Sequence, residues 1–244
     1  CYAVQTIGSV ANQNLHGTSQ VDMVIVTHPD FSSQAERLAN FHRENDGLSV
    51  KVVTPQQIYN EFSSGSQDVC AIRDYMRMIY DKSNGIYPSY LLLFGRPSYD
   101  FRGIEGSCTL YVPNYESNST INEDHFRSND DFFGILDEGE GENCIGTIDI
   151  SIGRFPVSTL AQAQIAVDKT INYSTKEILG ANTQSCNFGD WKNIATFVAD
   201  DEDHNTHINT ADAMARAAEQ NNPNINLDKI YLDAYQQVTY SSSA

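Results

Sequence analysis

The sequence predicts an α/β protein with a mostly parallel sheet that is flanked by helices. Two short segments, Met23–Val26 and Tyr90–Phe94, are almost entirely apolar. A continuous apolar run of this length is typical of a parallel strand that is buried on both faces. Patterns with helical spacing alternate with strand patterns along most of the chain, and this alternation favours parallel strands joined by helices on both faces of the sheet.

The first 94 residues predict three strands and three helices. In chain order these are a strand at Val21–Thr27, a helix at Ser32–Asn45, a strand at Leu48–Val53, a short helix that opens at Thr54–Pro55, a helix at Gln67–Ser83 and a strand at Tyr90–Phe94. Two capping patterns support the helix starts, because Glu36 follows Ser33 by three residues and Gln57 follows Thr54 by three. Gly47 suits the end of the first helix.

The alternation stops at residues 95–146 and then resumes. This segment is rich in Gly, Ser, Asn and acidic residues, and it is too long for a passive connection. The later elements are a strand at Ile148–Ile152, a helix at Thr159–Leu179, a linker at Asn182–Asp190, a strand at Ile194–Ala199, a helix at Thr206–Gln220 and a strand at Leu227–Leu232. We therefore expect a first α/β subdomain at 1–181, with an acidic insertion at 95–146, and the start of a second at 182–244.

Acidic side chains dominate the charge of the chain. The 32 Asp and Glu residues outnumber the 15 Lys and Arg residues, and the formal net charge is −17. Such a chain repels phosphate backbones and anionic membrane surfaces, so we expect no nucleic-acid partner. No apolar stretch approaches the ~20 residues that a membrane-spanning helix needs. Because Cys1 does not open a signal sequence, we expect the chain to be part of a longer exported protein.

The five cysteines do not predict a metal site or a nucleophile. Their spacing includes no Cys-x-x-Cys pair and no histidine partner at zinc-finger distance, which argues against structural zinc. Cys70 falls in an apolar helical pattern, and we expect it to be a buried core thiol. Cys108 and Cys144 flank the same acidic segment and could form a disulfide, but the odd count leaves at least one thiol free.

Several segments, in their order along the chain, resemble the gingipain-type cysteine peptidases, and in particular the sortase branch of that family in type IX secretion. The resemblance runs from about Ala11 to about Gln237. The segments that carry it are Asn12–Gly17, Tyr90–Gly95 with Ser98–Asp100, Asn129–Gly134, Asp149–Pro156 and Ala166–Tyr173. The resemblance implies a caspase-like or gingipain-like fold, with a complete first subdomain and a truncated second one.

The resemblance also implies an activity and a cellular setting. The family's catalytic His lies in a Gly-His-Gly type of turn and its nucleophile at an Ala-Cys strand end, and neither pattern occurs here. We therefore expect the catalytic His and Cys to lie beyond Ala244. The chain by itself is then expected to have no peptidase activity. As a whole, the protein would process the C-terminal sorting domains of exported cargo proteins at the bacterial cell surface or outer membrane, with secretion-machinery proteins as partners.

An acidic loop follows the predicted strand that ends at Ala199. In gingipain-type enzymes the matching loop contributes acidic groups near the catalytic His and the substrate pocket. By that resemblance, Asp201, Asp203 and His207 are candidate residues that line the substrate pocket or orient the catalytic groups. The alternative is a helix N-terminus that carries carboxylates, which the helix dipole stabilises by about 0.3–1 kcal/mol each. A calcium loop that starts at Asp201 is a weaker match, because the turn glycine is replaced by threonine.

The acidic insertion holds the candidate metal ligands. Asp130, Asp131, Asp137 and Glu138 offer hard oxygen atoms near glycines, a composition that suits calcium, and the resemblance implies structural calcium in this area. The alternative is a solvated acidic loop, which is the commoner outcome for a run of charges. Arg154 matches a family signature at a strand end, and we expect it to tether the insertion by ion pairs. No cofactor for catalysis is expected.

Two other functions compete with that of a peptidase. A non-catalytic, calcium-stabilised module that binds a partner at the cell surface or on a secretion platform stays open as the alternative, because the chain lacks the family's catalytic patterns. A nucleotide-binding domain is disfavoured, because no glycine-rich phosphate-binding loop of either common type occurs.

Overall fold

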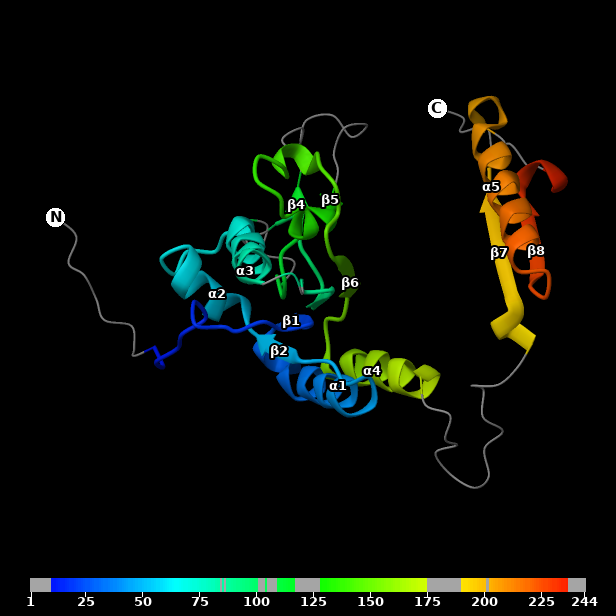
Figure 1. The fold of residues 1–244 in the computed structure, drawn as a ribbon. Helices are drawn as coiled ribbons and strands as arrows, with labels where there is room; N and C mark the ends of the chain where they lie inside the picture. Colours follow the sequence, from blue (N-terminus) through cyan, green and yellow to red (C-terminus); the bar gives the residue numbers. More distant parts are fainter. Residues whose placement is uncertain are drawn as a thin grey trace, which may run out of the picture. The chain divides into compact units, whose positions relative to one another are not determined.

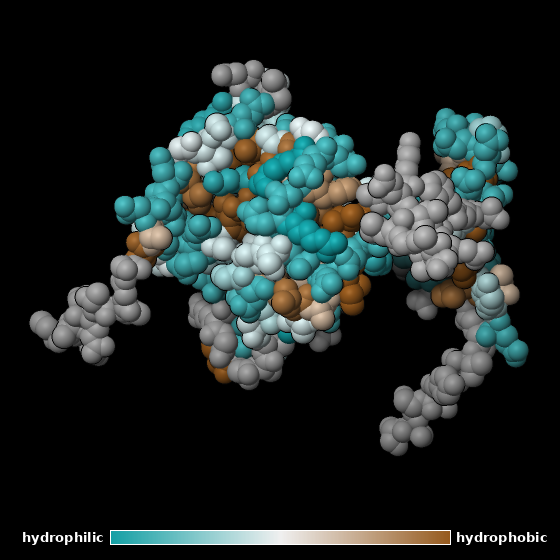
Figure 2. All heavy atoms as spheres, turned by 90° about the horizontal axis from the view of Figure 1, so that it is seen from below, coloured by the Kyte–Doolittle hydropathy of each residue, from teal (hydrophilic) through white to brown (hydrophobic). Residues whose placement is uncertain are grey.

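The chain forms two compact units, Cys1–Ser174 and Thr175–Ala244, each with a parallel sheet (Figure 1). The computed structural model describes residues 10–83, 85, 87–100, 104, 109–116, 128–174, 190–200 and 202–236. Among these residues, no helix combines the length and the apolar character that crossing a membrane requires. The face drawn in Figure 2 is mostly hydrophilic, in agreement with the acidic composition.

The first unit contains a four-stranded parallel sheet with the order β2–β1–β3–β6. Its strands are β1 (Met23–Thr27), β2 (Val50–Val53), β3 (Tyr90–Phe94) and β6 (Ser151–Phe155). The predicted α/β fold, with a parallel sheet flanked by helices, is confirmed. The strand predicted at Ile148–Ile152 corresponds to β6, and the prediction placed it three residues too early. The reason is that Asp149 bonds to the insertion through its backbone and its carboxylate instead of pairing with β3.

Four helices cover the two faces of this sheet (Figure 1). They are α1 (Ser32–Asn45) and α4 (Leu160–Ser174) on one face, and α2 (Pro55–Phe62) and α3 (Val69–Lys82) on the other. The capping box predicted at Thr54 is present, with Gln57 as its partner. The cap predicted at Ser33 was wrong, because the 3-10 turn η1 (Pro29–Phe31) leads straight into α1 and Ser33 already lies inside the helix.

Alternate residues of the central strands build two separate cores. Val24 and Val26 of β1 pack on the side of α2 and α3, whereas Met23 and Ile25 pack on the side of α1 and α4. All five residues of β1 are buried, as expected for a central parallel strand with helices on both faces.

The acidic insertion packs against the sheet. It contains the short antiparallel pair β4 (Tyr115–Glu116) and β5 (Ser128–Asn129), followed by the 3-10 turns η2 (Asp131–Gly134) and η3 (Glu142–Cys144). Phe132 and Phe133 of η2 belong to the core beneath α2 and α3. Gly134 permits this close approach, because a Cβ atom there would lie 2.4 Å from Cδ1 of Ile152 on β6.

In the described residues of the second unit, one helix accompanies two parallel strands. After the 3-10 turn η4 (Asp190–Asn193), it contains β7 (Ile194–Ala199), α5 (Glu202–Asn221), β8 (Asn226–Tyr231) and the turn η5 (Leu232–Ala234). Exposure alternates along β7, where Val198 is 66% exposed and Ala199 only 7%. Within this unit α5 therefore covers one face of the strand pair and leaves the other open.

Candidate functional site

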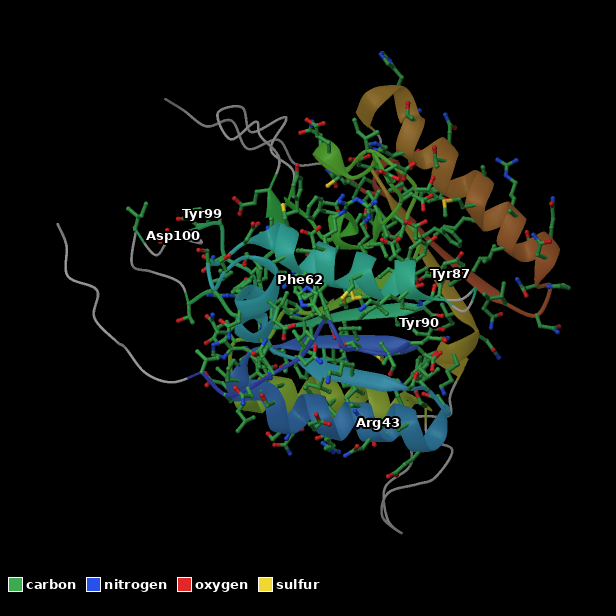
Figure 3. All side chains as sticks on the ribbon, turned by 60° about the vertical axis from the view of Figure 1, so that its left-hand side comes forward. Arg43, Phe62, Tyr87, Tyr90, Tyr99 and Asp100 are labelled. Atoms are coloured by element: carbon green, nitrogen blue, oxygen red, sulfur yellow. The ribbon has the colours of Figure 1, made fainter. Side chains whose placement is uncertain are left out.

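The carboxyl ends of the parallel strands are where ligand sites form in sheets of this kind. β3 leads at this end into the loop that carries Tyr99 and Asp100, whereas Tyr87 and Tyr90 mark the opposite end of the sheet (Figure 3). His28 follows β1, and its Nδ1 accepts a hydrogen bond from the backbone N–H of Asp30 at 3.3 Å. His28 thus caps the turn η1.

Arg154 on β6 gathers the loops at this edge into one hydrogen-bonded cluster. Its guanidinium donates to both carboxylate oxygens of Asp130 at 2.7 Å. It also donates to the carbonyl oxygens of Gly95, Val112 and Pro113 at 2.8–2.9 Å. The Arg154 side chain is 10% exposed and that of Asp130 27%. The prediction that Arg154 tethers the acidic insertion through an ion pair is confirmed, and the bidentate geometry makes the tether directional.

The structure places the four predicted calcium ligands in different surroundings. Both carboxylate oxygens of Asp130 are bonded to Arg154, and Asp131 opens η2 with its own N–H bonded to the side chain of Asn129. Asp137 and Glu138 lie in an exposed turn farther along. Within the described part of the chain, no three Asp, Glu, His or Cys side chains converge closely enough to hold a metal ion. Calcium binding stays a prediction.

The acidic loop after β7 contains one described pair of polar side chains. Nδ1 of His207 lies 2.6 Å from Oδ1 of Asp200, and both side chains are exposed. Asp201 lies outside the described residues, and Asp203 lies in the first turn of α5 with a side chain that is also outside them. The sequence analysis missed Asp200 as the partner of His207. A residue that follows a strand can contact the second turn of the next helix, and these two residues do so.

Helix α5 begins at Glu202, earlier than the predicted start at Thr206. The acidic residues therefore lie at the helix N-terminus, where the helix dipole favours carboxylates. The backbone there is irregular, because His204 and Asn205 have φ angles of 57° and 60°.

The described cysteines are poor candidates for a nucleophile. Cys70 and Cys144 are free thiols. Partial desolvation, together with the nearby Asp68, raises the pKa of Cys70, and partial desolvation with the nearby Asp131 raises that of Cys144. A raised pKa disfavours the reactive thiolate. The expectation that Cys70 is a core thiol was wrong, because the residue lies in the first turn of α3 and is exposed. Cys108, the alternative disulfide partner of Cys144, lies outside the described residues.

Glu61 at the end of α2 organises a further cluster that the sequence analysis missed. Its carboxylate accepts hydrogen bonds from the backbone N–H groups of Leu15 at 2.7 Å and His16 at 3.0 Å, and from the side-chain amide of Gln13 at 2.9 Å. Burial alone would raise the pKa of Glu61, but these bonds outweigh it and lower the pKa to about 2. The cluster fixes residues 13–16 against α2.

The fold agrees with the comparisons with known proteins. The model of Peptidase family C25 matches residues 16–244, so the chain belongs to this family, the gingipain family of cysteine peptidases. Among solved structures it is similar to dimeric latent PorU from Porphyromonas gingivalis, with 38% sequence identity and a TM-score of 0.60. That similarity covers 68% of this chain and 17% of the PorU chain. No curated protein matches the sequence.

Proposed function

We propose that this chain is the N-terminal part of a gingipain-like cysteine endopeptidase or sortase that processes the C-terminal sorting domains of exported cargo. The observation that carries the proposal is the 38% identity to PorU over 68% of the chain, at a TM-score of 0.60. The match to the peptidase family over residues 16–244 supports the assignment to a cysteine peptidase.

In this proposal the chemistry belongs to residues outside the chain. A cysteine thiolate attacks the peptide carbonyl, a histidine acts as the base, and backbone N–H groups stabilise the oxyanion before hydrolysis or transfer to an acceptor amine. The part of the chain that the structure describes offers two thiols, Cys70 and Cys144, and their raised pKa values make both unsuited to this role.

The setting of the proposed function is extracytoplasmic, at the bacterial cell surface or outer membrane. Exported cargo proteins would be the substrates, and secretion-machinery proteins would be partners. The segment after β7 that leads into α5, with Asp201, Asp203 and His207, would lie near the substrate pocket. Structural calcium in the acidic insertion belongs to the same proposal, whereas catalysis would need no cofactor.

A direct test compares the longer protein with this chain alone. Each is incubated with a purified protein that ends in a C-terminal sorting domain, and mass spectrometry follows the cleavage. We expect cleavage by the longer protein, blocked by a thiol-alkylating inhibitor, and none by the 244-residue chain. Inhibitor-sensitive turnover by the short chain would contradict the assignment of the catalytic pair, and a longer protein that never cleaves would contradict the peptidase proposal.

The alternative is a non-catalytic module that binds a partner at the cell surface or on a secretion platform. The raised pKa values of the two described thiols favour it for the isolated chain. The same experiment separates the two functions, because a binding module would retain cargo without cutting it.

A further inference from the structure

A hollow of about 600 Å³ lies at the amino end of strands β3 and β6. Residues 87–89 line it from the segment before β3, residues 148–152 line it from the start of β6 and the segment before it, and Asp131 lines it from η2. Its volume falls within the roughly 300–1,000 Å³ that is typical of small-molecule pockets. The hollow is therefore large enough for a small organic molecule.

Two half-exposed apolar side chains form part of its wall. Tyr87 and Ile148 both line the hollow, and each is 50% exposed. The ring of Tyr87 stacks on that of Tyr80 in α3, with 4.5 Å between the ring centroids and 27° between the planes. Figure 3 shows Tyr87 at the same end of the sheet as Tyr90. Because the stacking orders Tyr87 before anything binds, a ligand that packs on this ring has little ordering cost to overcome.

Two carboxylates line the same hollow, and none of the described residues that line it is basic. Asp131 has its backbone N–H bonded to the side chain of Asn129, whereas its carboxylate makes no hydrogen bond or ion pair with the described residues. Asp149 uses Oδ2 to accept the N–H of Leu136 at 2.7 Å, which leaves Oδ1 for another donor.

The stacked tyrosines report a negative potential beside this hollow. Desolvation raises the pKa of Tyr80, and the charges of Asp149 and Asp137 raise it further. An apolar wall in a region of negative potential suits an organic cation, since an aromatic face and a carboxylate each attract a positive charge.

The number of carboxylates decides between kinds of cation. A calcium ion takes about 6–8 oxygen ligands, and among the described residues no third acidic side chain converges with these two. The two carboxylates come from different segments, η2 and the approach to β6. Such a pair suits a flexible molecule with two charged ends and an aliphatic middle.

We propose that this hollow binds a linear aliphatic diamine or polyamine, with ammonium groups at Asp131 and Asp149 and methylene groups along Tyr87 and Ile148. The ammonium groups donate to the carboxylates in charge-assisted hydrogen bonds, and the methylene chain covers apolar surface that is otherwise exposed to water. The inference is independent of peptidase chemistry in the longer protein.

Nuclear magnetic resonance on the full ¹⁵N-labelled chain tests the proposal, with putrescine as the probe. We expect saturable shifts at the backbone amides of Ser89, Asp131 and Asp149. Butylamine keeps the chain length but lacks the second charge, and it should bind about tenfold more weakly. Mg²⁺ carries the same total charge without an aliphatic chain, and it should not displace putrescine from these residues.

Three variants and one matched control sharpen the test. Asp131→Asn should weaken binding about tenfold and should leave the fold intact, because the carboxylate has no described partner to lose. Tyr87→Ala should weaken binding about two- to fivefold, as expected for the loss of an exposed cation–π contact, whereas Tyr87→Phe should bind as the parent does. The control is Glu44→Gln, which removes an exposed charge on α1, outside the hollow. It should also bind as the parent does.

Each outcome decides the question. Butylamine or Mg²⁺ that binds as tightly as putrescine would overturn the inference of a ligand with two separated charges. Shifts confined to other residues, or no saturable shift, would overturn the location. If Asp131→Asn and Tyr87→Ala keep a folded spectrum and bind putrescine as tightly as Glu44→Gln does, the proposal is wrong.

Discussion

Replacing Arg154 by methionine should destabilise the first unit far more than an ordinary surface substitution. The change removes five hydrogen bonds at once, two to Asp130 and three to backbone carbonyls of the surrounding loops. Removing one partner of a buried ion pair costs about 3–5 kcal/mol. Asp130 is 27% exposed and can recover some hydration, so we expect the lower end, about 3 kcal/mol.

Differential scanning calorimetry measures this loss. For a domain of roughly 150–250 residues, each kcal/mol shifts the melting temperature by about 2–4 °C, so Arg154→Met should lower it by roughly 6–12 °C. Arg154→Lys should recover little, because an ammonium group cannot reproduce the planar fork. The matched control is Arg37→Met. This residue pairs with Asp168, and both side chains are well exposed, so the loss should be within about 1 kcal/mol.

A double-mutant cycle separates the ion pair from the carbonyl contacts. Arg154→Met and Asp130→Ala are measured singly and together, and their coupling should exceed about 1 kcal/mol, because the two side chains bond directly. Equal losses for Arg154→Met and Arg37→Met, or a coupling near zero, would refute the role given to this cluster.

Three further predictions concern pH, metal and local stability. The pKa of Glu61 is lowered from 4.5 to about 2 in the folded chain, so its stabilising effect is present above pH 4.5 and is lost as the pH falls toward 2. Urea melts across this range should show that loss in the parent and not in Glu61→Gln. If the acidic insertion holds calcium, free Ca²⁺ at a hundredfold excess over its dissociation constant should add about 2.7 kcal/mol to the free energy of unfolding. EDTA should then lower the melting temperature, and the double substitution Asp130→Asn and Asp131→Asn should abolish this response to EDTA. Melting curves indifferent to EDTA exclude such a site. Hydrogen exchange should find β7 and β8 less protected than β3, because a two-stranded sheet is marginal by itself, and equal protection would contradict this.

Local patterns in the sequence were enough to predict the central architecture. The apolar runs around Ile25 and Leu92 predict strands that are buried on both faces, and β1 and β3 are such strands. The Thr54 capping box is equally local, since its bonds span three residues. The strand at Ile194–Ala199 also falls where its pattern predicts.

The features that were missed depend on contacts between distant segments. Glu61 binds residues 45–48 positions away, and nothing in its own neighbourhood marks it as different from other surface acids. The start of β6 was misplaced because Ile148 and Ile150 have the alternation of a strand, whereas Asp149 between them bonds to the insertion. The tether by Arg154 was predicted, but its three carbonyl partners have no signature in the sequence.

The strand order carries a consequence for the sequence of events during folding. β6 is the last strand of the first sheet to leave the ribosome or a translocation channel, and among the described strands it pairs with β3 alone. Until it arrives, a nascent chain holds three strands with one bare edge on β3, and such edges recruit strands from other chains. Arg154 arrives on the same strand, after every residue that it binds. Pairing of β3 with β6 and ordering of the acidic insertion are therefore a single late event, and a chain stalled before that point leaves both the β3 edge and the insertion unsecured.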